Sequence, residues 1–377
     1  MELSREEILY SAAEKGTTSG TKCPGCGANL SFHPEKESLW CLHCDNEVKF
    51  PTAPAIKLEF ARLLDPANKW TDTHVFQCSR CGAKEILSRE EIAKACAFCG
   101  TSNIVQASDI SGIKPNAVLP FKITKETAIT RFINWVKKKF FAPRRFKKNV
   151  RAEEVDGIYN PAFTFDTDTI TQYRGRLGRR VTYTTRVNGR TVTRTRIDYI
   201  NISGTYSGLF NDILIQASST IQQKDVNKMQ PFDMFNSKEY NQNFLFGYAA
   251  NQYSKDGTTC WGEARAVIDE RIKRAILQKY PGYTIVAEYH ANTVYNNIMF
   301  RYVLLPVYVG HCNYGKKFDK IKKEKVDKTY NFYVNGTNGK VAGKMPVSAP
   351  KVLMVVGIVL GAVVGALAGI TKAMGWW

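Results

Sequence analysis

Residues 179–200 read RRVTYTTRVNGRTVTRTRIDYI, two β-rich runs joined by Asn188-Gly189. Asn-Gly at the centre of two such runs is a strong signal for a type I′ turn, since both central residues must take positive φ angles. Arginine and threonine dominate both faces of the resulting ladder, so at least one face is expected to meet solvent or a polyanion. The stretch predicts an antiparallel, arginine-rich hairpin over residues 174–200, in which the paired residues include Tyr183 with Arg194 and Val181 with Arg196.

The sequence on either side of this hairpin predicts an α+β body over residues 115–345. Thr124 can cap a helix, since apolar residues recur at helical spacing after it, and they do so again over residues 262–280. Strand-like runs cover 158–165, 283–290 and 299–309, and a turn-centred hairpin covers 330–341. Long strands with few helices argue against a doubly wound parallel sheet and favour one rich in antiparallel strands.

Positive charge is concentrated in two segments. The 377-residue chain carries a net charge of +19. Residues 137–151, here called the basic segment, contain eight basic residues and no acid, and residues 174–196 contain eight arginines and no acid. Without these sixteen charges the rest of the chain carries +3. The segments are candidate contacts for anionic lipid or nucleic acid, or solvated faces that keep the protein soluble. The candidate residues are Lys137, Lys138, Lys139, Arg144, Arg145, Lys147, Lys148, Arg179, Arg180, Arg186, Arg190, Arg194 and Arg196.

Eight of the ten cysteines form two identical C-x2-C-x14-C-x2-C sets. A C-x-x-C turn places two thiolates on one side of a metal ion, and a second turn completes a tetrahedron suited to zinc. The spacing predicts zinc ribbons over residues 21–52 and 76–106, joined by a linker over 53–75. Pairing within each set is the natural assignment, with a site interleaved between the sets as the alternative. The ligands are Cys23, Cys26, Cys41 and Cys44 in the first set, and Cys78, Cys81, Cys96 and Cys99 in the second.

Two structural zinc ions per chain are therefore expected. A four-cysteine site leaves no coordination position for water or substrate, so its metal contributes to folding and not to catalysis. The polar N-terminus predicts a helix over residues 1–20, with Ser4 and Glu7 as a capping box, and no signal peptide. Paired cysteines in a reducing compartment more often bind metal than form disulfides.

Residues 352–371 predict a transmembrane helix, preceded by a juxtamembrane linker over 346–351. Nineteen residues from Val352 lack charge, and at 1.5 Å per residue they span roughly 28 Å, close to the hydrocarbon core of a bilayer. The alternative is a buried helix of a soluble protein. Lysines are more numerous before the span than after it, so we expect a single-pass membrane protein with a cytoplasmic N-terminal body and the C-terminus outside.

Glycine recurs at every fourth position of this helix and forms one smooth ridge. Small residues at this spacing allow two helices to approach closely in lipid. The ridge predicts a homo- or hetero-oligomer packed through the span. Its residues are Gly357, Gly361, Gly365 and Gly369.

The chain resembles a family of bacterial proteins with tandem zinc ribbons and a C-terminal membrane anchor, often mislabelled as replication-restart helicase-like. Besides the ribbons, the resemblance rests on stretches spread over nearly the whole chain: 119–126, Trp135, 137–143, 157–166, 304–308 and 334–343. The chain departs from the family pattern at Asn160 and Ala162. Some members are encoded beside stomatin/flotillin-type and phage-shock-type membrane proteins. The resemblance implies an adaptor that recruits or organises such partners.

Three functions remain open from the sequence. The first is a membrane adaptor or scaffold, and the second is a membrane-associated nucleic-acid-binding protein that uses the ribbons and the arginine-rich hairpin. The third is an enzyme, for which Asp166 with Asp168, or His311 with Cys312, are the candidate pairs. No nucleophile, base and orienting group occur together, and no G-x-x-x-x-G-K-[ST] phosphate loop exists in the chain. We therefore predict that the protein is not an enzyme, and no catalytic residue is assigned.

Overall fold

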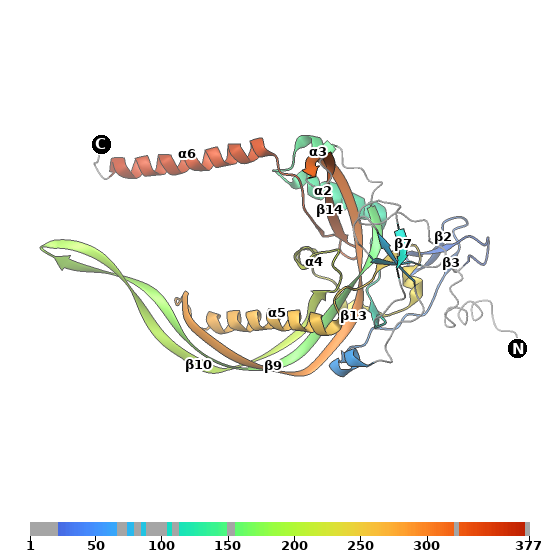
Figure 1. Cartoon of the computed structure of the whole chain (residues 1–377), viewed down its shortest axis with the longest axis horizontal. Coiled ribbons are helices and arrows are strands. Elements are labelled where there is room, and N and C mark those ends of the chain that lie inside the picture. Colours follow the sequence, from blue (N-terminus) through green and yellow to red (C-terminus); the bar gives the residue numbers. More distant parts are fainter. Residues whose placement is uncertain are drawn as a thin grey trace.

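Three very long strands dominate the computed structural model: β9 (Val155–Val187), β10 (Arg190–Gln216) and β13 (Ile285–Asp319). They curve together through the length of the molecule (Figure 1). The structure describes residues 22–65, 74–78, 84–87, 104–107, 113–148, 155–319 and 324–373. The helix predicted over residues 1–20 lies outside these ranges.

The hairpin of β9 and β10 confirms the predicted turn and register. Asn188 and Gly189 have φ angles of 52° and 75°, as a type I′ turn requires. Tyr183 pairs with Arg194, and Val181 pairs with Arg196. The ladder continues to Ala162 and Gln216, so residues 174–200 are only the distal part of a much longer hairpin.

β13 adds a third antiparallel strand along the other side of β9. The pairing runs from Ile285 opposite Gly178 to Gly310 opposite Val155. Two segments that the sequence pattern separates, 283–290 and 299–309, thus belong to one continuous strand. The parts of β10, β9 and β13 that extend beyond the body are residues 166–212 and 285–298. We call them the arm. Past Gly178 β9 and β10 are the two strands of the arm that the structure describes.

Shorter strands extend this ladder into a sheet of twelve described strands. Most pairs are antiparallel, and the exceptions are β12 on β9 and β8 on β13. The mixed helices and mainly antiparallel sheet confirm the predicted α+β class. The added strands are β4 (Leu58–Glu59), β5 (His74–Cys78), β6 (Lys84–Leu87), β7 (Ile104–Ala107), β8 (Ala117–Val118), β11 (Lys238–Glu239), β12 (Ala249–Asn251), β14 (Glu324–Asn335) and β15 (Val341–Gly343).

Helix α5 (Gly257–Gln278) covers one face of the arm. Asp256 caps its N-terminus by accepting a hydrogen bond from the Thr259 amide, 2.7 Å away. Its apolar stripe, which includes Ile268, Ile272 and Ile276, is fully buried with Leu177 of β9. This stripe supplies the hydrophobic area that an isolated three-stranded arm would lack.

Helix α2 (Lys125–Lys138) begins at Thr124, which caps it as the sequence predicts. Its buried residue Phe132 stacks on Phe332 of β14, so the helix lies on the body near the end of the chain. A short helix, α3 (Arg144–Lys148), follows directly. The remaining short helices are α4 (Gln223–Met229) and the 3-10 turns η1 (Phe60–Leu64), η4 (Met234–Asn236) and η5 (Gln242–Leu245).

Part of the predicted linker over 53–75 is not a free linker. Strand β4 pairs with β13, and Phe60 of η1 contacts Trp261 of α5 at 5.7 Å between ring centroids. Lys57 forms an ion pair with Asp166 of β9. Residues 54–64 therefore pack on the body, through partners more than 100 residues away in the chain.

A second, three-stranded sheet comprises β1 (Leu30–His33), β2 (Ser38–Cys41) and β3 (Glu47–Val48). Phe32 and Phe50 from this part of the chain pack edge-on against Phe244 of the body. Helix α6 (Ala349–Ala373) leaves the body at its opposite end, and it lies on the same side of the long sheet as α5 (Figure 1).

Candidate functional site

The first cysteine set converges on one point. Cys23 and Cys26 lie in the turn before β1, and Cys41 and Cys44 lie at the end of β2 and in the turn after it. All four sulfur atoms lie within 4.8 Å of one another. Cys23 and Cys44 are 3.4 Å apart at sulfur, as are Cys26 and Cys41. Zinc–sulfur bonds of about 2.3 Å place tetrahedral ligands about 3.8 Å apart, so this group could bind a metal ion.

The electrostatics of the group favour a cation. Burial raises the pKa of the Cys23 thiol, but hydrogen bonds from the Cys26 and Gly25 amides and from the Cys44 and Asn46 side chains outweigh burial and lower it to about 6. The Asn46 amide lowers the pKa of Cys44, but contacts with Cys26 and Cys23 outweigh it and raise the value to about 12. Four thiolates therefore do not coexist here without a compensating positive charge.

The second cysteine set is only partly described. Cys78 is buried at the end of β5. Cys81, Cys96 and Cys99 lie outside the described residues. The second ribbon, the pairing of its ligands and a second metal ion thus stay predictions.

One described helix is long and apolar enough to cross a membrane. The span Ala349–Ala366 within α6 is 18 residues long, and none of it is buried in the protein. At 1.5 Å per residue it is about 27 Å long. The helix begins three residues before the predicted start of the span at 352, since Pro350 is tolerated in a first helical turn. Backbone positions 357, 361, 365 and 369 of the glycine ridge all fall in this helix.

The root of α6 is hydrogen-bonded to the basic segment. The Lys351 ammonium donates to the carbonyl oxygens of Phe140 at 2.7 Å and Ala142 at 3.0 Å. The Ser348 amide donates to the Phe141 carbonyl at 2.9 Å. No sequence pattern indicates this contact, because the partners are about 210 residues apart. The structure thus places the described part of the basic segment, residues 137–148, at the point where α6 leaves the body.

Apolar and basic side chains alternate around this root. Phe140 and Phe141 are 54% and 41% exposed and contact one another edge-on. Phe146 is buried against Tyr314 and fixes α3 to the body. Exposed phenylalanine beside exposed cations is the pairing found where proteins meet a membrane interface. The basic residues here are Lys137, Lys138, Lys139, Arg144, Arg145, Lys147 and Lys148.

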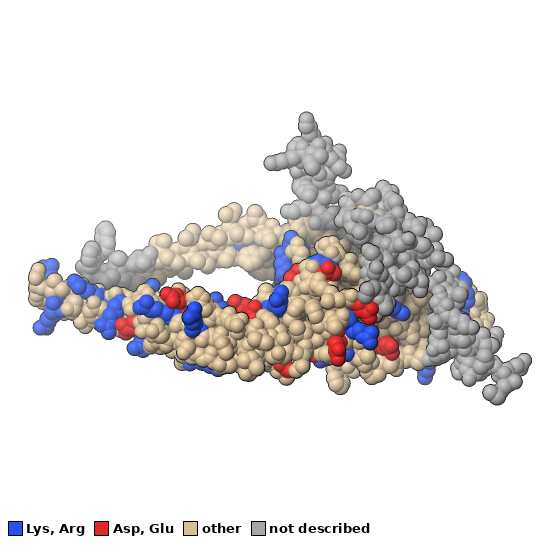
Figure 2. All heavy atoms as spheres, turned by 60° about the horizontal axis from the view of Figure 1, so that its bottom comes forward, with Lys and Arg blue, Asp and Glu red and all other residues tan. Residues whose placement is uncertain are grey.

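The arginines of the arm have different neighbours. Arg196 and Arg179 lie 2.9 and 4.0 Å from the Asp198 carboxylate, and Arg196 also lies over the Tyr183 ring. Arg176 lies over Tyr199 at 4.4 Å. Figure 2 shows basic side chains outnumbering acidic ones along the distal arm. The described arginines of this set, which also include Arg180, Arg186, Arg190 and Arg194, all lie on β9 and β10.

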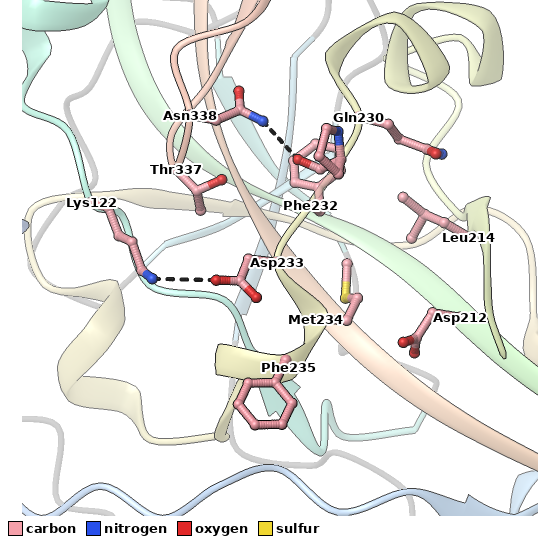
Figure 3. A pocket seen from close by; sticks show the side chains of 11 residues that line it. Lys122, Asp212, Leu214, Gln230, Phe232, Asp233, Met234, Phe235, Thr337 and Asn338 are labelled. Carbon is pink, nitrogen blue, oxygen red and sulfur yellow. Dashed lines mark hydrogen bonds and ion pairs between the residues drawn. The ribbon is translucent and has the colours of Figure 1, made fainter.

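An open pocket of about 630 Å³ lies between the body and the base of the arm. Asp233 and Lys122 form an ion pair at 3.6 Å on its wall (Figure 3). A hydrogen bond from Asn236 and the nearby Lys122 ammonium lower the pKa of Asp233. The other carboxylate of the pocket, Asp212, pairs with buried Arg301. Both acids of this lining therefore already have cationic partners.

Asp166 and Asp168 also have structural partners. Asp166 is 9% exposed, pairs with Lys57 and accepts a hydrogen bond from the Asp212 amide at 2.8 Å. Asp168 accepts from the Asn297 side chain at 2.8 Å. Asn297 and Asp212 both have φ angles of 51°, at positions where the ladder shifts register. The two carboxylates hold these irregular positions in place.

Comparison with known proteins gives one informative similarity. The chain is 29% identical over 341 residues to the uncharacterized protein YdjG of Bacillus subtilis (strain 168). The match covers 88% of this chain and 91% of YdjG. No family model and no solved structure matches. The similarity extends over most of both chains, and it carries no assigned activity.

Proposed function

We propose that this protein is a membrane-anchored adaptor whose body recruits or organises partner proteins at the cytoplasmic face of the membrane. One observation carries the proposal: Lys351 and Ser348 at the root of α6 are hydrogen-bonded to the basic segment. If α6 spans a bilayer, these bonds hold the basic segment at the level of the lipid headgroups.

The chemistry of the segment suits that position. Each Lys or Arg near an anionic leaflet contributes about 1 kcal/mol to binding, and the effect fades within a Debye length. Phe140 and Phe141, both exposed, would contact the boundary between headgroups and acyl chains. Cations on the body side of the span also favour a cytoplasmic body and an external C-terminus.

The remaining features fit an adaptor. A metal held by Cys23, Cys26, Cys41 and Cys44 would stabilise a small module packed on the body. A side chain added at Gly357, Gly361 or Gly365 would meet no atom within 4 Å, so the ridge is open to a partner helix in the membrane. The resemblance to proteins encoded beside membrane-organising proteins supports the same function.

Binding of anionic lipid by the full-length protein tests the proposal. The protein in uncharged detergent micelles is compared with the triple variant Lys137→Gln/Lys138→Gln/Lys139→Gln for its affinity for an anionic lipid titrated into the micelles. Three exposed charges at about 1 kcal/mol each predict binding weaker by up to about 100-fold at low salt. Arg186→Gln/Arg190→Gln/Arg194→Gln is the matched control in the arm and should bind nearly as the unmodified protein does. Equal losses in both variants would contradict a special position for the basic segment.

Metal content tests the paired-ribbon part of the proposal. Elemental analysis of the folded, full-length protein is expected to give two zinc ions per chain, one for each cysteine set. Cys41→Ser should remove one of them, because Cys41 is fully buried within the first set. One zinc ion or none in the unmodified protein would contradict the second ribbon or both.

A second candidate function is nucleic-acid binding along the arm. The observation that favours it is the stacking of Arg176 on Tyr199 and of Arg196 on Tyr183, since alternating cations and aromatic rings suit phosphates and bases. Competition between single-stranded nucleic acid and anionic lipid distinguishes the two. Loss of nucleic-acid binding in the arm triple variant, with binding of anionic lipid retained, would favour this second function.

A further inference from the structure

The outer edge of β10 is open from Arg190 to Phe210. On one side this stretch forms a ladder with β9, and none of the strands that the structure describes pairs with the other side. Only beyond it does the Gln223 side chain hydrogen-bond to the backbone of Leu214 and Gln216. An unpaired edge presents a row of backbone N–H and C=O groups that another strand can use. The register between β10 and β9 is unbroken from Arg190 to Phe210, so the edge is regular over that length.

The middle of this edge lacks the usual protection against pairing. Residues 199–210 read YINISGTYSGLF, with no charge and no proline. Edge strands are normally protected by charged residues, prolines or bulges. The opposite edge of the arm, on β13, does carry such features, since its register shifts at Val286/Glu288 and again at Asn296/Met299.

We infer that β10 pairs with β10 of a second copy of this chain, antiparallel and about a two-fold axis at Gly204. The two sheets would then join into one through their uncharged segments. The inference concerns a protein–protein contact of the arm and does not depend on the proposed membrane function.

Charge selects the antiparallel arrangement. Parallel pairing would place Arg190, Arg194 and Arg196 of one copy beside the same arginines of the other, and like charges directly opposite one another are destabilising. Antiparallel pairing places the two arginine-rich tips at opposite ends of the joined sheet. The uncharged segments of the two copies then face one another over residues 199–209.

The faces of the sheet and the extent of the uncharged segment select the centre. A two-fold axis perpendicular to the sheet keeps the α5 face of both copies on one side, so paired residues must both be even-numbered or both odd-numbered. Gly204 lies at the middle of the uncharged residues 199–210, so a centre there pairs Tyr199 with Leu209 within the regular part of the ladder.

The side chains at this centre fit one another. On the α5 face, Ile202 lies opposite Tyr206 of the second copy. On the other face, exposed Tyr199 lies opposite Leu209, which is 68% exposed in the single chain. Aromatic and branched apolar pairs are the ones that stabilise neighbouring strands.

The mass of the full-length protein in detergent micelles, measured by light scattering after size-exclusion chromatography, tests the inference. The unmodified protein should be a dimer. Ser203→Lys/Thr205→Lys, which adds exposed charges to the edge, should be a monomer at the same concentration. Gln172→Lys/Thr182→Lys adds the same charge to exposed positions on the same face of β9, and it should remain a dimer.

Amide hydrogen exchange gives a second measurement that does not rely on variants. Diluting the unmodified protein below its dimerisation constant should accelerate exchange in residues 199–210 of β10 but not in residues 162–172 of β9. A monomeric unmodified protein would overturn the inference. A dimer that persists in the edge variant would do the same, since it would place the contact elsewhere, for example on the glycine ridge.

Discussion

The basic segment and residues 174–196 of the arm each contain eight basic residues and no acid, but their surroundings differ. The first is a short helix and turn whose backbone accepts hydrogen bonds from the root of α6. The second is a ladder in which arginines lie against tyrosines and Asp198. Two segments that composition does not distinguish are thus separated by what they contact. A positive stretch indicates a polyanion, but only its neighbours indicate which one.

Deleting residues 352–377 should have the largest effect of the changes considered, and the affected property is the attachment of the protein to the membrane. Without the span, the basic segment has about seven described charges with which to hold a membrane, and partial screening at physiological salt makes them insufficient for stable anchoring. We expect the truncated protein in the soluble fraction after cell fractionation. Persistent pelleting that high salt reverses would show that the basic segment binds membranes by itself.

Ile272→Ala should destabilise the arm and leave the region around α2 and the basic segment unchanged. Ile272 is 1% exposed between α5 and the arm, and losing such a side chain costs about 2–5 kcal/mol of unfolding free energy. Amide exchange should accelerate in α5 and in β9 and β10, while α2 exchanges as before. Val267→Ala, at a 37% exposed position of the same helix, is the matched control and should change little. Equal acceleration in α2 would show that the arm and the body unfold as one unit.

Lys351→Met should have the smallest effect. It tests whether Lys351 fixes the basic segment against the root of α6. The substitution keeps the apolar stem and removes two hydrogen bonds, so we expect a loss of about 1–3 kcal/mol from the contact between α6 and the segment. Exchange at Phe141 and Ala142 should rise. Lys344→Met, an exposed lysine before the helix, is the control. An unchanged exchange rate at both residues would contradict a role for Lys351 in fixing the segment.

Local chemistry accounts for the successful predictions. The Asn188-Gly189 turn, the Thr124 cap and the spacing of Cys23, Cys26, Cys41 and Cys44 all depend on residues near one another in the chain. The apolar length of α6 is likewise a property of one segment. The second cysteine set and the function follow from the same kind of reasoning and stay predictions.

The predictions that needed revision depend on distant residues. The pattern of residues 283–309 indicates two strands, yet pairing with β9 makes one, because a long neighbouring strand satisfies the backbone through the irregular positions around Asn297. The linker after the first ribbon docks because Lys57 and Phe60 find partners on β9 and α5. Neither partner can be read from the segment itself.

The sequence by itself determined the Asn188-Gly189 turn, the Thr124 cap, the first four-cysteine set and the apolar helix, since each depends on interactions within a few tens of residues. Only the tertiary structure decided that β13 joins the hairpin, that β10 keeps an open edge and that the basic segment lies at the root of α6. These features depend on which of many similar strands and charges meet across more than 100 residues. That choice follows from burying apolar area and satisfying backbone groups over the whole chain at once.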